Sequence, residues 1–294
     1  VKFGGTLLLE VFGMVKLKEF DFLRISPGKK VRLSHYPTDS TKHLPARDKA
    51  DEATEKQTLK IGELQDCLYA EGKHSLLVIL QGMDASGKDG AVRKVFDEVN
   101  PTGVQVTSFK QPSSEELRHD FLWRCHNKVP GKGNIGVFNR SYYEEVLVVR
   151  VHADRLLPPD LRNRKDEWER RYRMINEFEN ILGDAGTRVV KFFLHISKDE
   201  QRERFIARQK DPEKHWKLAA GDFAERQFWD DYQQAYEKLL PATSTKDAPW
   251  YIIPADHKWA RNYWLSHILT GILQEMNPKP PELHDKSLIM KRFK

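Results

Sequence analysis

The stretch LLVILQGMDASGKDGAVRKVF, residues 76–96, decides the fold of this 294-residue chain. An apolar segment leads into a turn bracketed by Gly82 and Gly87, and a basic amphipathic segment follows. The turn has the phosphate-loop spacing G-x-x-x-x-G-K, which ends at Lys88. Backbone amides of such a loop, together with the N-terminus of the next helix, form a binding site for anions. We expect phosphate contacts from the loop residues Gly82, Ala85, Ser86, Gly87, Lys88 and Asp89.

Two carboxylates distinguish this loop from the usual motif. Asp89 stands where a serine or threonine usually helps to hold magnesium. An acidic residue that opens a helix is also favoured by capping and by the helix dipole, so a structural role for Asp89 is the alternative. Asp84 lies inside the loop, where its charge would repel a phosphate unless a divalent cation lies between them. We therefore predict that Asp84 binds Mg²⁺, with Mn²⁺ as a substitute.

The composition indicates a globular protein with a heavily charged surface. Hydrophobic residues make up 39% and charged residues 31%, and the formal net charge is +6. This excess suits a polyanionic ligand without singling out nucleic acid. The two cysteines, Cys67 and Cys125, have neither metal-ligand nor disulfide-framework spacing, so we expect a reducing, cytoplasmic environment. We find no signal peptide or membrane anchor in the printed sequence, because the apolar run at its start is interrupted by Glu10.

The rest of the chain alternates β-rich runs with helical patterns. Strands are predicted at residues 76–80, 104–109, 135–138, 189–196 and 250–253. Helices are predicted at 53–70, 166–182, 199–209 and 223–240, with a shorter one after the loop along Val92, Phe96 and Val99. Such alternation predicts an α/β fold with a parallel sheet covered on both faces, whose ligands bind at the carboxyl ends of the strands.

A second informative segment is IGVFNRSYYEEVLVVRVH, residues 135–152. In phosphate-loop enzymes a neighbouring strand usually ends in an acid that contributes to the magnesium site. Here that position is Asn139, which offers a neutral oxygen as a metal ligand. Arg140 follows and could bind phosphates in bidentate fashion. Glu144 lies about one helical turn further on. The alternative is that it lies on a solvated helix face, where it would have no function.

These segments resemble the polyphosphate kinase 2 family. Besides the loop and residues 136–152, the resemblance is carried by SFKQPSSEELRHDFLWR, KFFLHISKDEQRERFIAR, DPEKHWK, GDFAERQFWDDY and TSTKDAPWYIIPADHKW, in that order, over about residues 20–277. FNRSYYEEVLVVRVH, with Asn139 and Glu144, is similar to the third class, which acts on both nucleoside monophosphates and diphosphates. Other classes tend to carry aspartate at the Asn139 position and WYNR in place of YYEE. Gly82 departs from relatives that often have alanine there.

The resemblance implies a three-layer P-loop kinase fold, with a parallel sheet flanked by helices and a helical lid. We divide the chain into an N-terminal arm (1–50), which lacks sustained periodicity, a kinase domain (51–277) with the lid around 155–225, and a C-terminal tail (278–294). The resemblance also implies Mg²⁺-dependent transfer of the terminal phosphoryl group of inorganic polyphosphate to AMP and ADP, giving ADP and ATP, reversible in principle. Self-association as a homo-oligomer, dimer or tetramer, follows from the same resemblance.

The expected site residues fall into three groups. Catalytic roles are expected for Asp84, Lys88, Arg140 and Glu144, with Asp84 and Asn139 at the metal. Cations of the lid are expected to bind polyphosphate, although any one of them could be a solvated charge; they are Arg204, Arg208, Lys214 and Lys217. Nucleotide binding is expected, in part by resemblance, from Lys110, Arg124, Asn139, Arg140, Glu144 and Arg150. The aromatic side chains Trp123, Tyr142, Tyr143, Trp216 and Trp250 are expected to pack in the core rather than to stack on adenine.

Two other functions are compatible with parts of the sequence. An ATP-dependent nucleoside monophosphate kinase would have the same loop, but the excess of lid cations and the family motifs favour polyphosphate as donor. A basic nucleic-acid-binding protein is the alternative from another class. The sequence has no recognisable RNA-recognition or helix-turn-helix signature, so we expect neither a nucleic acid nor a membrane as partner.

Overall fold

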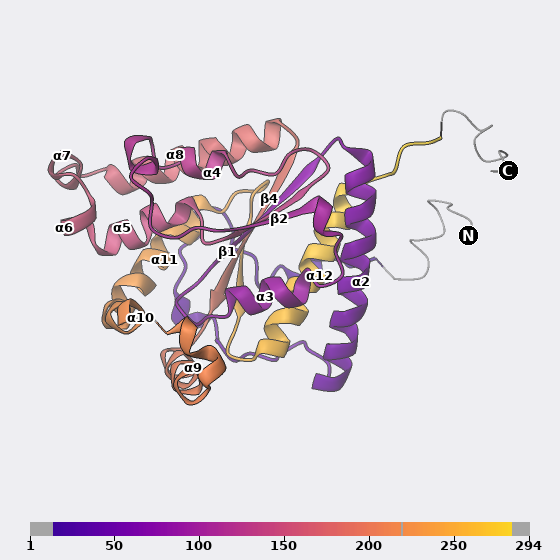
Figure 1. Ribbon diagram of the computed structural model, residues 1–294, viewed down its shortest axis with the longest axis horizontal. Helices are drawn as coiled ribbons and strands as arrows, with labels where there is room; N and C mark the ends of the chain where they lie inside the picture. Colours follow the sequence, from indigo (N-terminus) through magenta and orange to yellow (C-terminus); the bar gives the residue numbers. More distant parts are fainter. Residues whose placement is uncertain (1–13, 219, 284–294) are drawn as a thin grey trace.

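The structure, a computed structural model, describes residues 14–218 and 220–283 (Figure 1). Its centre is a five-stranded parallel sheet with the strand order β2-β3-β1-β4-β5. The α/β fold predicted from the alternating pattern is therefore confirmed, and no predicted strand bound is wrong by more than two residues. The strands are β1 Ser75–Gln81, β2 Val104–Ser108, β3 Ile135–Asn139, β4 Thr187–His195 and β5 Trp250–Pro254.

Strand β1 lies in the middle of the sheet and is buried along its whole length. Successive side chains of a strand point to opposite faces, so the run LLVIL supplies both layers of the core. Leu76, Val78 and Leu80 pack into one buried cluster, and Leu77 and Ile79 pack into the other. A run without polar alternation is typical of a parallel strand that is covered on both faces.

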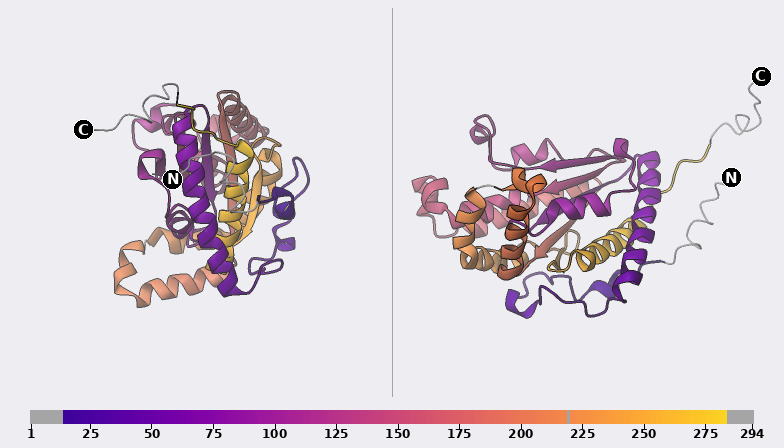
Figure 2. Two further views of the ribbon diagram at one scale, coloured as in Figure 1. Left: turned by 90° about the vertical axis from the view of Figure 1, so that its right-hand side faces the viewer. Right: turned by 60° about the horizontal axis from the view of Figure 1, so that its bottom comes forward.

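One face of the sheet is covered by helices α2 (Arg47–Glu71), α3 (Lys88–Val95) and α12 (Lys258–Met276). In Figures 1 and 2, α2 and α12 lie side by side. The sequence pattern did not predict α12, because this helix is buried on nearly all sides and shows no apolar stripe. The apolar positions Val92, Phe96 and Val99 predicted a helix that continues to about Val99, but α3 ends at Val95.

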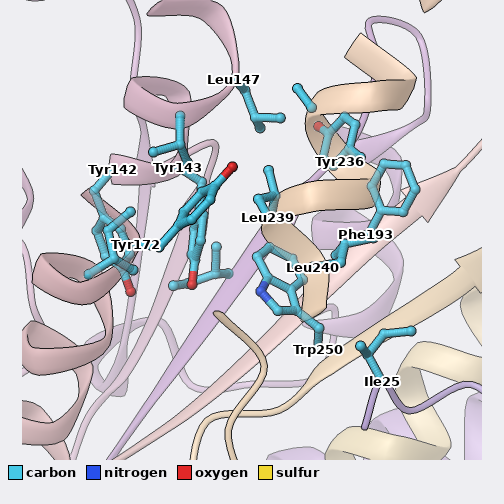
Figure 3. Close-up of a cluster of buried hydrophobic side chains, with 14 of the residues drawn as sticks. Ile25, Tyr142, Tyr143, Leu147, Tyr172, Phe193, Tyr236, Leu239, Leu240 and Trp250 are labelled. Carbon is cyan, nitrogen blue, oxygen red and sulfur yellow. The ribbon is translucent and has the colours of Figure 1, made fainter. Parts of the chain in front are cut away.

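The opposite face is covered by α8 (Glu167–Asp184), α11 (Trp229–Thr243) and the short helix η5 (Tyr142–Val146). Figure 3 shows the aromatic side chains of this layer around Trp250. At its centre is a buried ion pair between Lys191 and Glu179, whose carboxylate also accepts hydrogen bonds of 2.8 Å from the hydroxyls of Tyr142 and Tyr143. The network satisfies its buried charges internally, so we assign it to the core.

The pattern at 223–240 predicted a helix, and the range is helical along its whole length but divided into three elements. The chain forms α10 (Ala220–Glu225), turns through η7 (Arg226–Phe228) and then begins α11 at Trp229. Helix α9 (Lys198–Lys210) and the short helix η6 (Pro212–Lys217) precede this turn. Figure 2 shows α9 and α10 as an orange projection from the body of the molecule.

The range 155–225 predicted for the lid is too broad, because it includes β4, a strand of the central sheet. Within this range, α9, η6 and α10 form the projection seen in Figure 2. Short helices connect the other elements; they are η3 Pro101–Gly103, η4 Glu116–Arg118, α4 Trp123–His126, α5 Val148–Val151, α6 Ala153–Leu156 and α7 Pro159–Arg162.

The N-terminal arm lies along the β5 edge of the sheet. It contains two short helices, η1 (Leu17–Phe20) and η2 (Leu33–His35). Arg24 forms an antiparallel bridge with Tyr251, so the arm covers the strand edge that would otherwise be open. Residues 1–13, and residues 284–294 of the predicted tail, lie outside the part of the chain that the structure describes. Within the described part, none of the helices combines the length and apolar character needed to cross a bilayer.

Candidate active site at the phosphate loop

The phosphate loop leaves the carboxyl end of β1 and leads directly into α3, as the sequence predicts. Gly87 is the N-cap residue of α3 and has φ +97°, a conformation that residues with a Cβ rarely adopt. Gly82 has φ +155°, and a Cβ there would lie 2.7 Å from the Leu194 carbonyl oxygen. Ala85 has φ +61° without being a glycine, and Ser86 is fully buried. The loop is thus held in a tight turn whose shape depends on both glycines.

Lys88 lies against the inside of this turn. Its Nζ donates to the Gly82 carbonyl at 2.7 Å and to the Met83 carbonyl at 3.3 Å, and the residue is 8% exposed. Burial lowers the pKa of the Lys88 ammonium to about 8, with a further lowering from Arg140. A buried ammonium that has only carbonyl partners gains strongly from an anion, so the geometry favours phosphate binding at this point.

Asp84 and Arg140 form an ion pair across the mouth of the loop. Arg140 Nη2 donates to Asp84 Oδ1 at 2.6 Å. Arg140 follows β3 directly and has φ +63°, a strained conformation for a non-glycine residue that is often found at functional sites. Burial alone would lower the pKa of Arg140, but the nearby carboxylates of Glu144 and Asp84 outweigh this effect and raise it. The guanidinium is therefore fixed in its charged form beside the loop.

Two further carboxylates lie close to this pair. Glu144, in η5, has its pKa raised by burial, while Arg140 and Lys88 favour its charged form. Asp222, in α10, has its pKa raised by burial and by the charge of Asp84. The structure thus brings three carboxylates from different elements together around two cations. Asp222 lies in GDFAERQFWDDY, one of the segments that carry the family resemblance, but no role was predicted for it. It comes near Asp84 because α10 folds back towards the loop.

Asn139 and Asp89 contact each other. The Asn139 amide nitrogen donates to Asp89 Oδ1 at 2.6 Å, which ties the end of β3 to the first turn of α3. This contact supports the structural alternative for Asp89. The hydrogen bond uses only the amide nitrogen of Asn139 and leaves its side-chain oxygen available. That this oxygen binds a metal stays a prediction.

Arg204, expected to bind polyphosphate, lies behind the loop rather than in front of it. All five N–H donors of its guanidinium bind protein acceptors. These acceptors are the Glu200 carboxylate, at 2.8 Å, and the carbonyls of Ala85, Ser86, Ala255 and Asp256, at 2.6–3.0 Å. In this arrangement Arg204 supports the backbone of the loop and has no donor left for a ligand.

The other three lid cations are more accessible. Arg208 Nη1 lies 3.9 Å from Asp222 Oδ2, so it faces the same carboxylate group as the loop. Lys214 is paired with Asp211 and its side chain is 56% exposed. Lys217 lies over the ring of Trp216, with Nζ 4.9 Å from the centroid. Arg208 is therefore close to the site, whereas the two lysines lie on η6, where Lys214 is exposed and Lys217 is half-buried.

Besides Arg140, three other cations were expected at the nucleotide, and they lie in two places. Lys110 and Arg124 lie together beyond the end of β2, where Arg124 Nη2 donates to the Lys110 carbonyl at 2.8 Å. Arg150 lies in α5 and donates to the Tyr172 hydroxyl at 2.6 Å, with its guanidinium over the Trp168 ring. Arg150 thus packs against α8, and its expected role at the nucleotide stays a prediction.

Four of the five aromatic side chains expected in the core are at least partly buried. Tyr142, Tyr143 and Trp250 are almost fully buried, and Trp123 stacks on His119 with ring centroids 4.1 Å apart. The expectation is wrong for Trp216, which is 78% exposed. Trp216 was expected in the core because its side chain is hydrophobic. Its segment, however, has no apolar neighbours at the spacing of a core-facing helix or strand.

Comparison with known proteins identifies the family to which this arrangement belongs. A family model described as "Polyphosphate kinase 2 (PPK2)" matches residues 45–281. The chain belongs to the polyphosphate kinase 2 family. The ADP-polyphosphate phosphotransferase of Rhodopseudomonas palustris is 47% identical over 272 residues, which cover 91% of this chain and 93% of the relative. The AMP/ADP-polyphosphate phosphotransferase of Meiothermus ruber is also 47% identical, over 90% of this chain and 98% of the relative.

A solved structure of the same family agrees with the fold. The crystal structure of polyphosphate kinase 2 from Arthrobacter aurescens has a TM-score of 0.86 and 39% sequence identity, and covers 95% of this chain and 98% of that chain. The match therefore covers nearly the whole chain. The three-layer kinase fold predicted from the sequence is therefore confirmed.

The family's chemistry raises the question of whether the site can hold a divalent metal. In the described part of the chain, no group of three or more His, Cys, Asp or Glu side chains is arranged to hold a metal ion by itself. Mg²⁺ usually binds through one or two carboxylates plus water and substrate phosphates. Asp84 stands at the mouth of the loop with Asp222 nearby, so these residues fit a Mg²⁺ that the phosphate substrate helps to bind.

Proposed function

We propose that this member of the polyphosphate kinase 2 family is a Mg²⁺-dependent kinase that phosphorylates both AMP and ADP with inorganic polyphosphate. The observation that carries the proposal is the meeting of Lys88, Arg140 and three carboxylates at the carboxyl end of the sheet. Two polyanions can react only where their charges are neutralised and a metal is held between them. The relatives named for transfer from polyphosphate to ADP, or to AMP and ADP, support this choice of donor and acceptors.

The loop would hold the end of the donor chain. The amides at the start of α3 and the Lys88 ammonium would bind oxygens of the terminal phosphates. To do so, Lys88 exchanges its carbonyl partners in the turn for phosphate oxygens, which have a full negative charge. Arg140, which pairs with Asp84 beside the loop, would bind the phosphoryl group in transfer.

The reaction needs no covalent intermediate with the protein. A phosphate oxygen of AMP or ADP attacks the terminal phosphorus of polyphosphate, and the bond from that phosphorus to the bridging oxygen breaks. The shortened polyphosphate leaves with the bonding electron pair. Asp84 would hold Mg²⁺ together with the substrate, and the bound ion would supply charge neutralisation for the transferred group. Because the attacking oxygen is already anionic, positioning and charge stabilisation supply most of the rate enhancement.

Glu144 is the candidate for selecting between the two acceptors. Its carboxylate lies near Arg140 and Lys88, in the segment YYEE. We infer that it orients the acceptor, directly or through a metal, and that this matters more for AMP, which has fewer phosphates to bind. Inorganic polyphosphate and adenine nucleotides are thus the proposed partners of this site.

An assay with two donors tests the proposed function. AMP or ADP is incubated with Mg²⁺ and either polyphosphate or ATP, and formation of ADP and ATP is followed by chromatography. The proposal requires that polyphosphate supports phosphorylation of both acceptors far better than ATP supports phosphorylation of AMP. Activity with ATP alone would instead indicate a nucleoside monophosphate kinase, and would contradict the proposal.

A further inference from the structure

A second buried arginine lies behind the phosphate loop, next to Arg204. Arg261, near the start of α12, is 3% exposed and donates from Nη1 to the Gly87 carbonyl at 3.1 Å. Its Nε and Nη2 donate to Asn262 Oδ1 at 3.1 and 2.8 Å, which fixes the guanidinium plane. Neither α12 nor α9 is adjacent to the loop in sequence, so both arginines reach it through the fold.

Together the two arginines bind three consecutive carbonyls of the loop. Arg204 Nη1 binds the carbonyls of Ala85 and Ser86, and Arg261 Nη1 binds that of Gly87. In a trans peptide the C=O and the following N–H point in opposite directions. The amides that follow these carbonyls therefore point away from the arginines. The Ser86 amide donates to the Met83 carbonyl within the turn. The amides of Gly87 and Lys88 are then the ones directed to the ligand side of the loop.

The Arg261 guanidinium packs directly against the backbone of Gly87. A Cβ added to Gly87 would lie 2.0 Å from Arg261 Nη1. The glycine therefore serves two purposes: it permits the positive φ, and it lets a guanidinium approach the backbone closely. A side chain at this position would push the arginine and the loop apart.

The charge of Arg261 is not balanced by a carboxylate. Arg204 pairs with Glu200, but among the ion pairs of residues 14–218 and 220–283 none includes Arg261. Burial, and then the charge of Arg204, lower the pKa of Arg261 to about 10, which still leaves it charged at neutral pH. Burying an unpaired charge is costly, so its retention here indicates a use beyond packing.

We propose that Arg261, together with Arg204, is a positioning residue that holds the loop carbonyls to the rear so that the Gly87 and Lys88 amides face the donor phosphates. Arg261 also leaves one unbalanced positive charge directly behind the bound phosphates. Neither arginine touches the substrate; both act through the loop backbone. The inference rests on the proposed function, because it takes the donor chain to be the ligand of the loop.

Binding of tripolyphosphate measured without an acceptor tests this role. Wild type, Arg261→Ala and Arg261→Lys are titrated with tripolyphosphate and Mg²⁺, and separately with AMP, by calorimetry. We expect Arg261→Ala to weaken tripolyphosphate binding about tenfold, or about 1.4 kcal/mol, and AMP binding less than about twofold. Arg261→Lys keeps the charge and a donor, and should recover binding to within about threefold of wild type.

A matched control separates this effect from loss of any buried cation. Lys60, on α2, is also buried and pairs with Glu63 at 2.9 Å, away from the loop carbonyls. Lys60→Ala should lower the melting temperature while leaving tripolyphosphate affinity within about twofold of wild type. If Arg261→Ala does not fold, Asn262→Ala takes its place, because it removes only the acceptor that fixes the guanidinium; the expected loss is about threefold.

The outcomes are distinct. Equal affinity of wild type and Arg261→Ala for tripolyphosphate would overturn the inference, and so would an equal loss for tripolyphosphate and AMP, which indicates a general structural defect. If wild type itself failed to bind tripolyphosphate, the proposed function would fall and this inference with it. A selective loss that lysine repairs would support the positioning role.

Discussion

The cations behind the phosphate loop and those on the lid look alike in the sequence but differ in the structure. Arg204 and Arg261 are 8% and 3% exposed, and their donors are bound to backbone and side-chain acceptors. Lys214 and Lys217 lie on η6, next to an exposed tryptophan. A donor that the protein already uses cannot bind a ligand without breaking that contact. Partner saturation, rather than residue type, therefore separates positioning cations from candidate ligand-binding cations.

The two regions should also contribute different amounts of free energy. Hydrogen bonds from a buried charged group contribute about 1.5–3 kcal/mol each, whereas exposed charges contribute at most about 1 kcal/mol and are screened by salt. Lys88 lies between the two regions: it is buried like the rear arginines, but its carbonyl partners can be exchanged for phosphate. Substitutions should therefore lose less activity the further they lie from the loop towards the lid.

The largest loss is expected for Lys88→Ala. This change removes the side-chain cation that lies against the loop carbonyls, and we expect kcat/KM with polyphosphate and AMP to fall about a thousandfold. The far-ultraviolet circular dichroism spectrum should match wild type, since the ammonium contacts only loop carbonyls. Lys132 is exposed and lies before β3, so Lys132→Ala is the control and should keep wild-type activity. If Lys88→Ala keeps more than about a tenth of the activity, Lys88 does not stabilise the transferred phosphoryl group.

The next largest effect is expected for Asp84→Asn. Loss of the carboxylate removes the proposed metal ligand and frees Arg140, so we expect kcat/KM to fall about a hundredfold and the Mg²⁺ concentration for half-maximal activity to rise. Kinetics over a Mg²⁺ titration measure both quantities. Asp97, just after α3, has an exposed carboxylate, so the control variant Asp97→Asn should behave as wild type. An unchanged Mg²⁺ requirement in Asp84→Asn would show that the metal is held elsewhere.

Glu144→Gln should change the choice of acceptor more than the overall rate. We expect the ratio of kcat/KM for AMP to that for ADP to fall about tenfold, because the charged carboxylate is proposed to orient the monophosphate. The neighbouring Glu145 pairs with Arg171 at 2.8 Å, so Glu145→Gln should lower both values equally. Equal losses for AMP and ADP in Glu144→Gln would remove the selectivity role.

Donor binding should weaken as the pH rises through about 8. The Lys88 pKa is lowered to about 8 in the free protein, and a bound phosphate raises it again by favouring the charged form. Binding then takes up a proton above pH 8, so the dissociation constant of tripolyphosphate should rise about fivefold between pH 8 and 9. Calorimetry at both pH values measures this change. Lys88→Arg stays charged and should lose the pH dependence; if it shows the same fivefold rise, another group titrates.

The smallest effects are expected on the lid. Lys214→Ala removes an exposed charge and Lys217→Ala a half-buried one over the Trp216 ring. For each we expect KM for long-chain polyphosphate to rise only about two- to threefold. The effect should disappear at high salt and be weaker with tripolyphosphate, which is too short to extend from the loop along the lid. Initial rates at two ionic strengths measure it. A loss as large as that of Lys88→Ala would erase the distinction between loop and lid.

Much of the fold was predictable because its signals are local. The run LLVIL, the glycine turn and the switch from β-rich to helical periodicity gave the strands and the phosphate loop. Asp84, Lys88, Arg140 and Glu144 were named as site residues, and the structure brings them together at one end of the sheet. Family resemblance supplied the donor and the acceptors, which the loop pattern alone leaves open.

The features that were not predicted depend on contacts far apart in sequence. Arg261 lies 174 residues from Gly87 along the chain, and Arg204 lies 119 from Ala85. Nothing in the local pattern distinguishes an arginine that binds a carbonyl from one that binds a phosphate. Helix α12 was missed for a different reason: a helix buried on almost every side has no apolar periodicity to detect.

A crystal structure with tripolyphosphate, Mg²⁺ and AMP bound is the most direct test of the central claim, that the loop around Lys88 holds the donor. We predict phosphate oxygens within hydrogen-bonding distance of the Gly87 and Lys88 amides and of Lys88 Nζ, with Mg²⁺ at Asp84 and the rear arginines still on the loop carbonyls. Tripolyphosphate bound only along η6, with the loop free of phosphate, would contradict it.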